Sequence, residues 1–416
     1  MTEIPGFPAR RAALRLLDAV LHRGETLDQA AHNACQGVAI GADRALAIAL
    51  ASESLRWLID LDALIDSATE QVLAPEAKVR SVLRLMLAGH LRLETPPHAV
   101  IATALPLLTG GPKRLAHGVF STLVKREVKL PETPTLPAAV AARWGERAGP
   151  IAAALAQPPL LDLCLRDPAT TAEWTERLGG VSLCPGNVRL PRGEAIESLT
   201  GFGDRDGGGA WWVQDLAATL PARLIGAGES HVALDLCAAP GGKTLQLAAA
   251  GWVVSALDSS AKRLERLSDN LARTDLTAEI IIADALNWET DVQFDAILLD
   301  APCTATGTCR RHPDVLHRIG PRQIAEMAEL QAQLLKRAVG WLKPGGVLVY
   351  AVCSLEREEG EDHVPRMTLE LEPIRIEELP GGLTPSPEGW LRTDPGMLAE
   401  AGGLDGFFIA RWRKPT

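Results

Sequence analysis

The stretch Leu234-Asp235-Leu236-Cys237-Ala238-Ala239-Pro240-Gly241-Gly242-Lys243-Thr244 decides the fold. A short aliphatic strand ends in Asp235, a turn of small residues follows, and a helix begins near Lys243. Backbone N–H groups at such a helix start point at a bound ligand. The turn lacks the G-x-G-x-x-G spacing of dinucleotide sites, and Cys237 stands where a P-loop needs its first glycine. We predict a nucleoside-binding turn that does not wrap a phosphate. The alternative is an ordinary strand-to-helix turn.

Acidic residues end the next two expected strands. Asp258 follows residues 253–257, and Asp284 follows residues 280–283. An acidic residue after the second strand of such a sheet binds ribose hydroxyls, whereas its simpler role is to cap a helix. Two acidic residues in register favour a nucleoside cofactor. Because no phosphate loop is present, the pattern points to S-adenosyl-L-methionine rather than NAD or ATP.

The whole chain predicts several domains. Apolar spacing in residues 5–125 is helical, and strands alternate with helices from residue 231, which is typical of a doubly wound α/β domain. We expect an all-helical domain at 1–127, a proline-rich linker at 128–140, a small α+β module at 141–210 and an α/β domain at 211–416. Strands are expected at 160–166, 232–236, 253–257, 280–283, 296–299, 347–352, 374–379 and 406–411, and helices at 171–178, 243–250, 260–273 and 322–341.

Composition narrows the class of protein. The 416 residues carry a net charge of -10, but basic clusters at 10–15 and 125–129 leave room for RNA. No apolar run approaches the roughly 20 residues of a membrane span, and the N-terminus has no signal-peptide core, so we expect a cytoplasmic protein without membrane contact. The 7 cysteines form no Cys-x-x-Cys pair, which argues against a disulfide scaffold and against bound metal.

Two cysteines follow expected strands of the α/β domain. Cys303 ends Leu298-Leu299-Asp300-Ala301-Pro302-Cys303, and Cys353 lies in Leu348-Val349-Tyr350-Ala351-Val352-Cys353-Ser354. A thiolate that adds to C6 of cytosine makes C5 able to accept a methyl group, and an acid such as Asp300 near N3 would stabilise the charge on the ring. The alternative is that both cysteines are buried packing residues. The pattern leaves open which thiol attacks. The remaining cysteines are expected to be structural, and they are Cys35, Cys164, Cys184, Cys237 and Cys309.

Motifs at 235–244, 300–303 and 352–354 together resemble the NOL1/NOP2/Sun (Fmu) family of RNA cytosine-5 methyltransferases. Further matches lie at 212–215, 358–361 and 405–408, and residues 9–27, 43–62 and 97–126 resemble a NusB-like domain. The resemblance implies a Rossmann-like class I S-adenosylmethionine-dependent methyltransferase domain, preceded by an all-α NusB-like bundle and a small α+β module that both bind RNA. It implies 16S ribosomal RNA as substrate, with tRNA as the alternative, and we expect a monomer.

The resemblance also implies individual roles. Cys353 would be the nucleophile and Cys303 would assist release, although the DNA cytosine-5 methyltransferases use the thiol after the proline, so the opposite assignment stays open. The family usually has Ser where this chain has Thr304, and Thr where it has Val352. A non-catalytic RNA-binding or antitermination factor is the alternative of another class. The implied contacts of the cofactor or target base are Cys237, Ala238, Ala239, Pro240, Gly241, Gly242, Lys243, Asp258, Arg263, Asp284 and Asp300.

Overall fold

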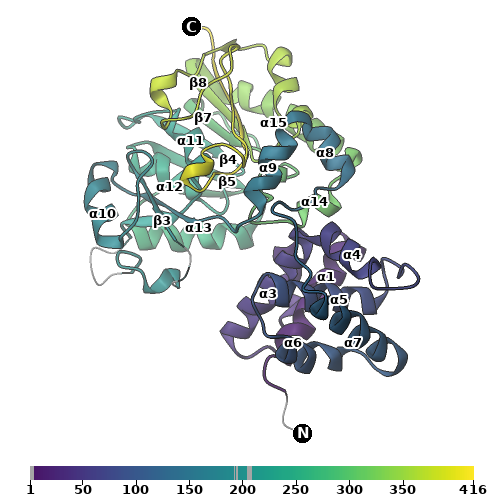
Figure 1. Cartoon of the computed structure of the whole chain (residues 1–416). Coiled ribbons are helices and arrows are strands. Elements are labelled where there is room, and N and C mark those ends of the chain that lie inside the picture. The colour runs from purple at the N-terminus through teal and green to yellow at the C-terminus, as the bar shows by residue number, and fades with distance from the viewer. Residues whose placement is uncertain (1–3, 192, 194, 204–208) are drawn as a thin grey trace. The chain divides into compact units, whose positions relative to one another are not determined.

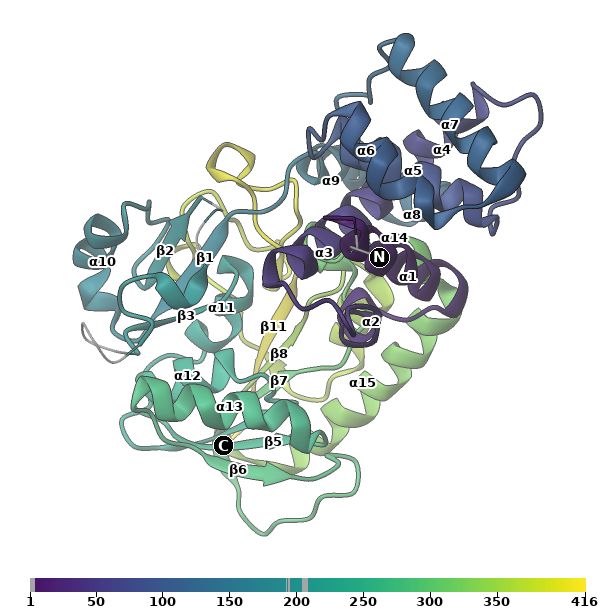
Figure 2. The ribbon, with the colours of Figure 1, turned by 90° about the horizontal axis from the view of Figure 1, so that it is seen from below.

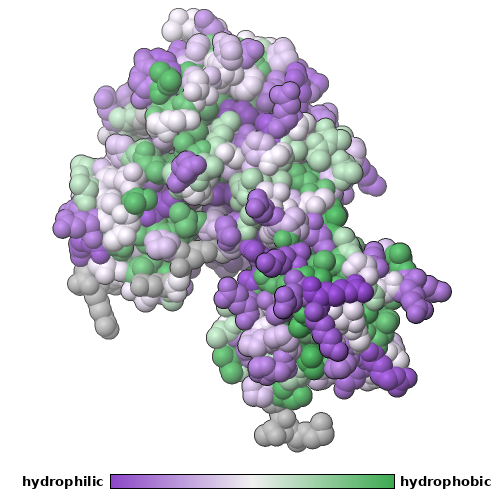
Figure 3. All heavy atoms as spheres, in the orientation of Figure 1, coloured by the Kyte–Doolittle hydropathy of each residue, from purple (hydrophilic) through white to green (hydrophobic). Residues whose placement is uncertain are grey.

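The computed structural model describes residues 4–191, 193, 195–203 and 209–416. The chain forms two compact units, Met1–Gln157 with Cys309–Ile319, and Pro158–Thr308 with Gly320–Thr416 (Figure 1). No helix of the described ranges is both long and apolar enough to span a lipid bilayer. Hydrophilic and hydrophobic residues are interspersed over the face drawn in Figure 3.

The first unit is all helical, as the apolar spacing predicts. Its central helix α5 is buried at every position from Val79 to Gly89. Two buried arginines of α5 are neutralised from α4, since Arg80 and Arg84 both pair with Asp62. The helices are α1 Phe7–Arg23, α2 Leu27–Ala34, α3 Gly41–Arg56, α4 Leu58–Asp66, α5 Lys78–Leu91, α6 Pro97–Ala104, α7 Gly110–Lys125, α8 Ala138–Trp144, α9 Ala148–Leu155 and α14 Val315–Arg318.

Three features of this unit differ from the sequence pattern. Within the helical apolar spacing of residues 5–125, the stretch 43–72 holds two helices, because the chain leaves the helical conformation at Trp57. The short helix α2 was not singled out by its apolar spacing. A capping box starts it, in which the Thr26 hydroxyl accepts from the Gln29 N–H and the Gln29 side chain accepts from the Thr26 N–H. Residues 138–155, expected to close the linker and open the next module, form α8 and α9 of the first unit.

A small antiparallel sheet opens the second unit, in the order β2-β1-β3. Strand β1 is Leu161–Leu165 and helix α10 is Thr171–Leu178, so both predicted elements are confirmed. Strands β2 Asn187–Leu190 and β3 Trp211–Val213 flank β1. Arg189 and Asp162 form a fully buried pair with two contacts of 2.7 Å, and Asp162 also accepts from the Leu216 N–H of helix α11, Leu216–Arg223. These contacts fasten the small sheet to α11, beside which it lies in Figure 2.

The main sheet has the order β10-β11-β8-β7-β4-β5-β6, with β9 paired to β11. Strands β4 to β8 are parallel and β11 is antiparallel to β8. The strand order reverses between β4 and β7, and ligands of such sheets bind outside the carboxyl ends of the strands at that point. The strands are β4 Val232–Leu236, β5 Val253–Asp258, β6 Glu279–Ile282, β7 Phe294–Asp300, β8 Leu342–Val352, β9 Glu370–Leu371, β10 Leu391–Arg392 and β11 Phe408–Arg413.

The expected strand at 374–379 is wrong. These residues form a 3-10 turn, Ile376–Glu378, whose Ile376 is exposed. The carboxylate of Glu378 accepts from the Arg375 N–H and from the Arg411 guanidinium. The local hydrogen bond to Arg375 and the distant pairing with Arg411 together compete with a sheet ladder, and the short strand β9 pairs with β11 instead.

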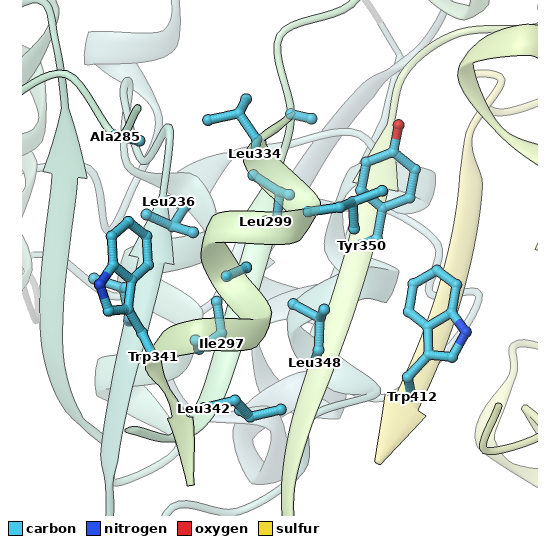
Figure 4. Packing of buried hydrophobic residues seen from close by; sticks show 14 of the residues in the cluster. Leu236, Ala285, Ile297, Leu299, Leu334, Trp341, Leu342, Leu348, Tyr350 and Trp412 are labelled. Carbon is cyan, nitrogen blue, oxygen red and sulfur yellow. The ribbon is translucent and has the colours of Figure 1, made fainter. Parts of the chain in front are cut away.

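Helices cover both faces of the main sheet. Helix α15, Pro321–Trp341, packs on one face, where Leu334 and Trp341 meet sheet residues such as Leu299 and Tyr350 (Figure 4). Helix α11 and helix α12, Gly242–Ala249, pack on the opposite face with sheet residues such as Leu298. Helix α13, Ala261–Thr274, belongs to a further cluster with α12 and β5. Side chains alternate between the two faces of a strand. Because helices cover both faces of this sheet, both sets of side chains are mainly apolar, and most polar side chains lie at the strand ends.

Candidate active site

The cofactor loop is shaped by one buried carboxylate and one glycine. Asp235 ends β4 fully buried, and its Oδ2 accepts from the Thr244 hydroxyl at 2.5 Å. Burial raises the pKa of Asp235 to about 7. Gly241 has a φ of 109°, and a Cβ there would lie 2.3 Å from the Leu267 Cδ1 atom of α13. Only glycine therefore lets the loop turn into α12 at this position.

Cys237 of this loop is a packing residue, as the sequence suggests. Its side chain packs against the α15-side core of the main sheet. Burial raises the pKa of its thiol to about 12, so it stays protonated and is a poor nucleophile.

The two acidic residues beyond the loop differ in their surroundings. Asp258 is buried, and its carboxylate accepts from the Ala239 N–H at 3.2 Å, the Ser260 N–H at 2.8 Å and the Arg263 guanidinium at 2.9 Å. It therefore joins the cofactor loop to the start of α13. Asp284 is exposed, and its carboxylate caps a turn by accepting from the Leu286 N–H at 3.0 Å.

The two candidate thiols lie side by side. Strands β7 and β8 are parallel neighbours in which Asp300 pairs with Ala351. The Sγ atoms of Cys303 and Cys353, beyond these strand ends, are 3.4 Å apart, and both cysteines are free. The hydrogen bond to Cys353, together with burial and nearby negative charge, raises the pKa of Cys303 well above its usual value. Of the pair, Cys303 is thus a thiol that holds its proton.

A buried ammonium group stands beside Asp300. The Nζ atom of Lys243 donates to Asp300 Oδ2 at 2.7 Å and lies 5.3 Å from the centre of the Phe407 ring. Burial acts to lower the pKa of Lys243, but Asp300 and, more weakly, Cys353 oppose it, and the pKa lies above its ordinary value. The sequence places Lys243 only in the cofactor loop, because nothing local to it reveals this long-range pair.

The structure also shows the contacts of Thr304 and Val352, the two residues that differ from the usual family pattern. The Thr304 hydroxyl donates to the carboxylate of Glu359 and lies 3.2 Å from the Ser354 hydroxyl. Threonine thus makes the contacts that a serine hydroxyl could make there. Val352 is fully buried in the core of the sheet, where its side chain meets apolar neighbours. Among the described residues, no group of three or more His, Cys, Asp and Glu side chains could hold a metal ion.

Known proteins resemble this chain over its whole length. Ribosomal RNA small subunit methyltransferase B of Salmonella paratyphi B is 33% identical over 439 residues, which cover 97% of each chain. The chain belongs to the methyltransferase B family. The model of the 16S rRNA methyltransferase RsmB/F family matches residues 223–413, and that of the NusB family matches residues 8–109.

A further methyltransferase B relative and a solved structure are also similar to this chain. The enzyme of Shewanella oneidensis is 42% identical over 213 residues, about half of each chain. The solved structure of PH0851 has a TM-score of 0.73 and 21% identity and covers 99% of both chains, which confirms the fold. The NusB helical domain and the Rossmann-like methyltransferase domain are thus both confirmed, and S-adenosyl-L-methionine is the cofactor of this methyltransferase family.

The residues around the loop fit a nucleoside-bearing cofactor. A cleft of about 290 Å³ lies along the loop, near the lower end of the sizes of small-molecule sites. Asp235 reaches it from the strand end with its Oδ1 atom buried and without a hydrogen-bond partner among the described residues. An ammonium or hydroxyl group of a ligand would satisfy that oxygen. Gly241 and Gly242 let a ligand approach the backbone, and Trp212 offers an apolar wall.

Proposed function

We propose that this methyltransferase B family member methylates C5 of a cytosine in RNA through a covalent bond between Cys353 and C6. The observation that supports it most is the 3.4 Å separation of two free thiols at the carboxyl edge of the sheet. The Lys243–Asp300 pair stands at the same strand ends. The relatives are named for the RNA of the small ribosomal subunit, and we infer 16S ribosomal RNA as the substrate and tRNA as the alternative.

In the proposed reaction, the Cys353 thiolate forms a bond to C6 of the flipped-out cytosine. The electron pair of the C5–C6 double bond then becomes available at C5. S-adenosyl-L-methionine, when bound, would supply the electrophilic methyl group that C5 takes, and its sulfur would keep the electron pair of the broken S–CH3 bond. A base removes the C5 proton, the C5–C6 double bond returns, and the bond from Cys353 to C6 breaks. The raised pKa of Cys303 keeps a proton beside the leaving Cys353 sulfur, where it assists release.

Asp300 and Lys243 have complementary roles in this proposal. Addition at C6 pushes negative charge toward N3 of the base, and a proton donor near N3 would stabilise it. Asp300 is one third exposed at its side chain while Lys243 is buried beneath it. The Lys243 ammonium orients the Asp300 carboxyl and offsets negative charge as it develops.

We further propose that the cofactor contacts the loop from Cys237 to Lys243 and the acidic residues after it, Asp258 above all. Arg263 already donates to Asp258, so it would orient the carboxylate toward ribose hydroxyls. Asp284 lies after the next strand with an exposed carboxylate, and the adenosine end of the cofactor would replace the contacts that it now accepts from the Leu286 N–H and the Asn287 side chain.

Replacing Asp258 with alanine should raise the dissociation constant of S-adenosyl-L-methionine about 10- to 100-fold, because hydrogen bonds to a charged acceptor are lost. Isothermal titration calorimetry of the purified protein measures this constant directly. Asp291→Ala, the same change at an exposed position between β6 and β7, is the matched control and should bind like the wild type. An unchanged constant in folded Asp258→Ala would remove this residue from the cofactor site.

Transfer of a labelled methyl group from S-adenosyl-L-methionine into RNA tests the activity itself. Incubation with small-subunit ribosomal RNA and, separately, with tRNA should label a cytosine at C5 in the ribosomal RNA. Label in tRNA alone would favour the alternative substrate. Absence of label from every RNA tested, with RNA binding intact, would favour a non-catalytic RNA-binding factor. The cytoplasmic location expected from the sequence stays a prediction.

A further inference from the structure

Glu359 lies directly beneath the two thiol-bearing loops. It ends the 3-10 turn Arg357–Glu359 and is fully buried. Its Oε1 atom accepts from the Ser354 hydroxyl at 2.7 Å and from the Thr304 hydroxyl, and its Oε2 atom accepts from the Thr304 N–H at 2.9 Å. Thr304 directly follows Cys303, and Ser354 directly follows Cys353. One carboxylate thus binds the residue after each thiol.

A second layer of contacts fixes this carboxylate. Gln331 of α15 donates to Glu359 Oε2 at 3.0 Å and to the Pro302 carbonyl at 2.8 Å, so the Cys303 loop is held on both sides of the thiol. His363 lies 3.2 Å from the Gln331 amide oxygen. Tyr350 of β8 donates to the backbone carbonyl of Glu359 at 2.7 Å. The turn that carries Glu359 is therefore anchored to the sheet and to α15.

The hydrogen bonds at Glu359 favour its ionised form. A backbone N–H and an amide N–H can only donate, so Oε2 must accept from both Thr304 and Gln331. Burial raises the pKa of Glu359, while the hydrogen bonds that it accepts oppose that rise. The negative charge of Glu359 is also among the causes that raise the pKa of Cys303.

We propose that Glu359 is a positioning residue for methyl transfer, which holds the Cys303 and Cys353 loops at the separation that a two-thiol reaction needs. Its negative charge also favours the protonated form of the Cys303 thiol. The inference rests on the proposed function. Its geometric part requires four accepted hydrogen bonds, whereas its electrostatic part requires the negative charge. Two substitutions at this position separate the parts.

Glu359→Ala removes both parts, and Glu359→Gln removes the charge alone. In the glutamine variant, the amide oxygen can accept from the Thr304 N–H and from Gln331, while the Thr304 and Ser354 hydroxyls turn to accept from the amide NH2. We expect Glu359→Ala to lower kcat about 100-fold with the KM for RNA nearly unchanged, since a displaced thiol costs about that much. Glu359→Gln should recover most of this loss.

The pH at which Cys303 becomes reactive can also be measured. A substitution that merely destabilises the protein would not change this pH. The rate of alkylation of Cys303 by iodoacetamide, followed by peptide mass spectrometry, should rise with a midpoint about one pH unit lower in Glu359→Gln than in the wild type, because a neighbouring negative charge is gone. Glu358→Gln, at the exposed neighbour in the same turn, is the matched control and should keep the wild-type midpoint and kcat.

The outcomes separate this inference from the proposed function. Wild-type kcat in folded Glu359→Ala, or an unshifted Cys303 midpoint in Glu359→Gln, overturns the role of Glu359 while the two-thiol reaction stands. If Glu359→Ala fails to fold, the midpoint in Glu359→Gln decides alone. If the wild type and Glu358→Gln transfer no methyl group to RNA, the proposed function fails and the inference fails with it.

Discussion

Replacement of Cys353 by alanine should lower methyl transfer to RNA by at least about 10⁴-fold, because the nucleophile of the covalent step is lost and removal of a nucleophile has costs of that order or larger. The variant should still fold, since the half-buried Cys353 directly follows the end of β8 and alanine fits the space of its side chain. Single-turnover transfer of labelled methyl, together with denaturing gels that detect a protein–RNA adduct, measures both effects. Neither product nor adduct is expected.

The matched control for Cys353→Ala is Cys309→Ala, a change of the same kind at a cysteine of the first unit. Cys309→Ala should transfer the methyl group at nearly the wild-type rate if it folds. Substantial turnover by Cys353→Ala would show that another group attacks the base. Since Cys303 is 3.4 Å away, it would be the first candidate, as in the assignment that the sequence left open.

Replacement of Cys303 by alanine should have the second largest effect on methyl transfer. Unlike loss of Cys353, it should block release of the covalent adduct and not its formation. The Cys353 thiolate can still add to C6, so the covalent adduct forms, but the proton-bearing neighbour that assists its departure is absent. We expect adduct to accumulate toward one equivalent of enzyme while turnover falls about 10²- to 10⁴-fold, the usual contribution of a proton-transfer group.

Time courses on denaturing gels measure adduct and free RNA together in this variant. The adduct should persist in Cys303→Ala under conditions where the wild type has released its product. If Cys303→Ala forms no adduct and Cys353→Ala accumulates it, the roles of the two thiols are exchanged. If both single variants turn over normally, neither thiol alone is required and the roles assigned to them here are wrong.

Elements with a local sequence signal were predictable from the sequence alone. The strands at 232–236 and 347–352 follow from short aliphatic runs, and the turn into α12 follows from small residues with Gly241 at the point of closest approach. The carboxyl ends of parallel strands share one edge of a sheet. The proximity of Cys303 to Cys353 was therefore expected, although which strands are neighbours was not fixed by the pattern.

Contacts between residues far apart in the chain were not predictable from the sequence. The Lys243–Asp300 pair and the contacts of Glu359 with Thr304 and Ser354 join segments far apart in the chain. No periodicity reports such contacts, because they depend on the strand order and on how α15 packs. The strand predicted at 374–379 was wrong for a related reason, because the pairing of Glu378 with Arg411 overrides the local preference of this segment for a strand.

The most direct test of the covalent mechanism uses RNA that carries 5-fluorocytosine in place of cytosine, because fluorine at C5 cannot leave as a proton does and the adduct cannot resolve. The wild-type protein is incubated with this RNA and S-adenosyl-L-methionine, digested, and analysed by mass spectrometry. The mechanism predicts a methylated nucleotide attached to the peptide that contains Cys353. Attachment to Cys303, or no attachment in a preparation that methylates ordinary RNA, would contradict it.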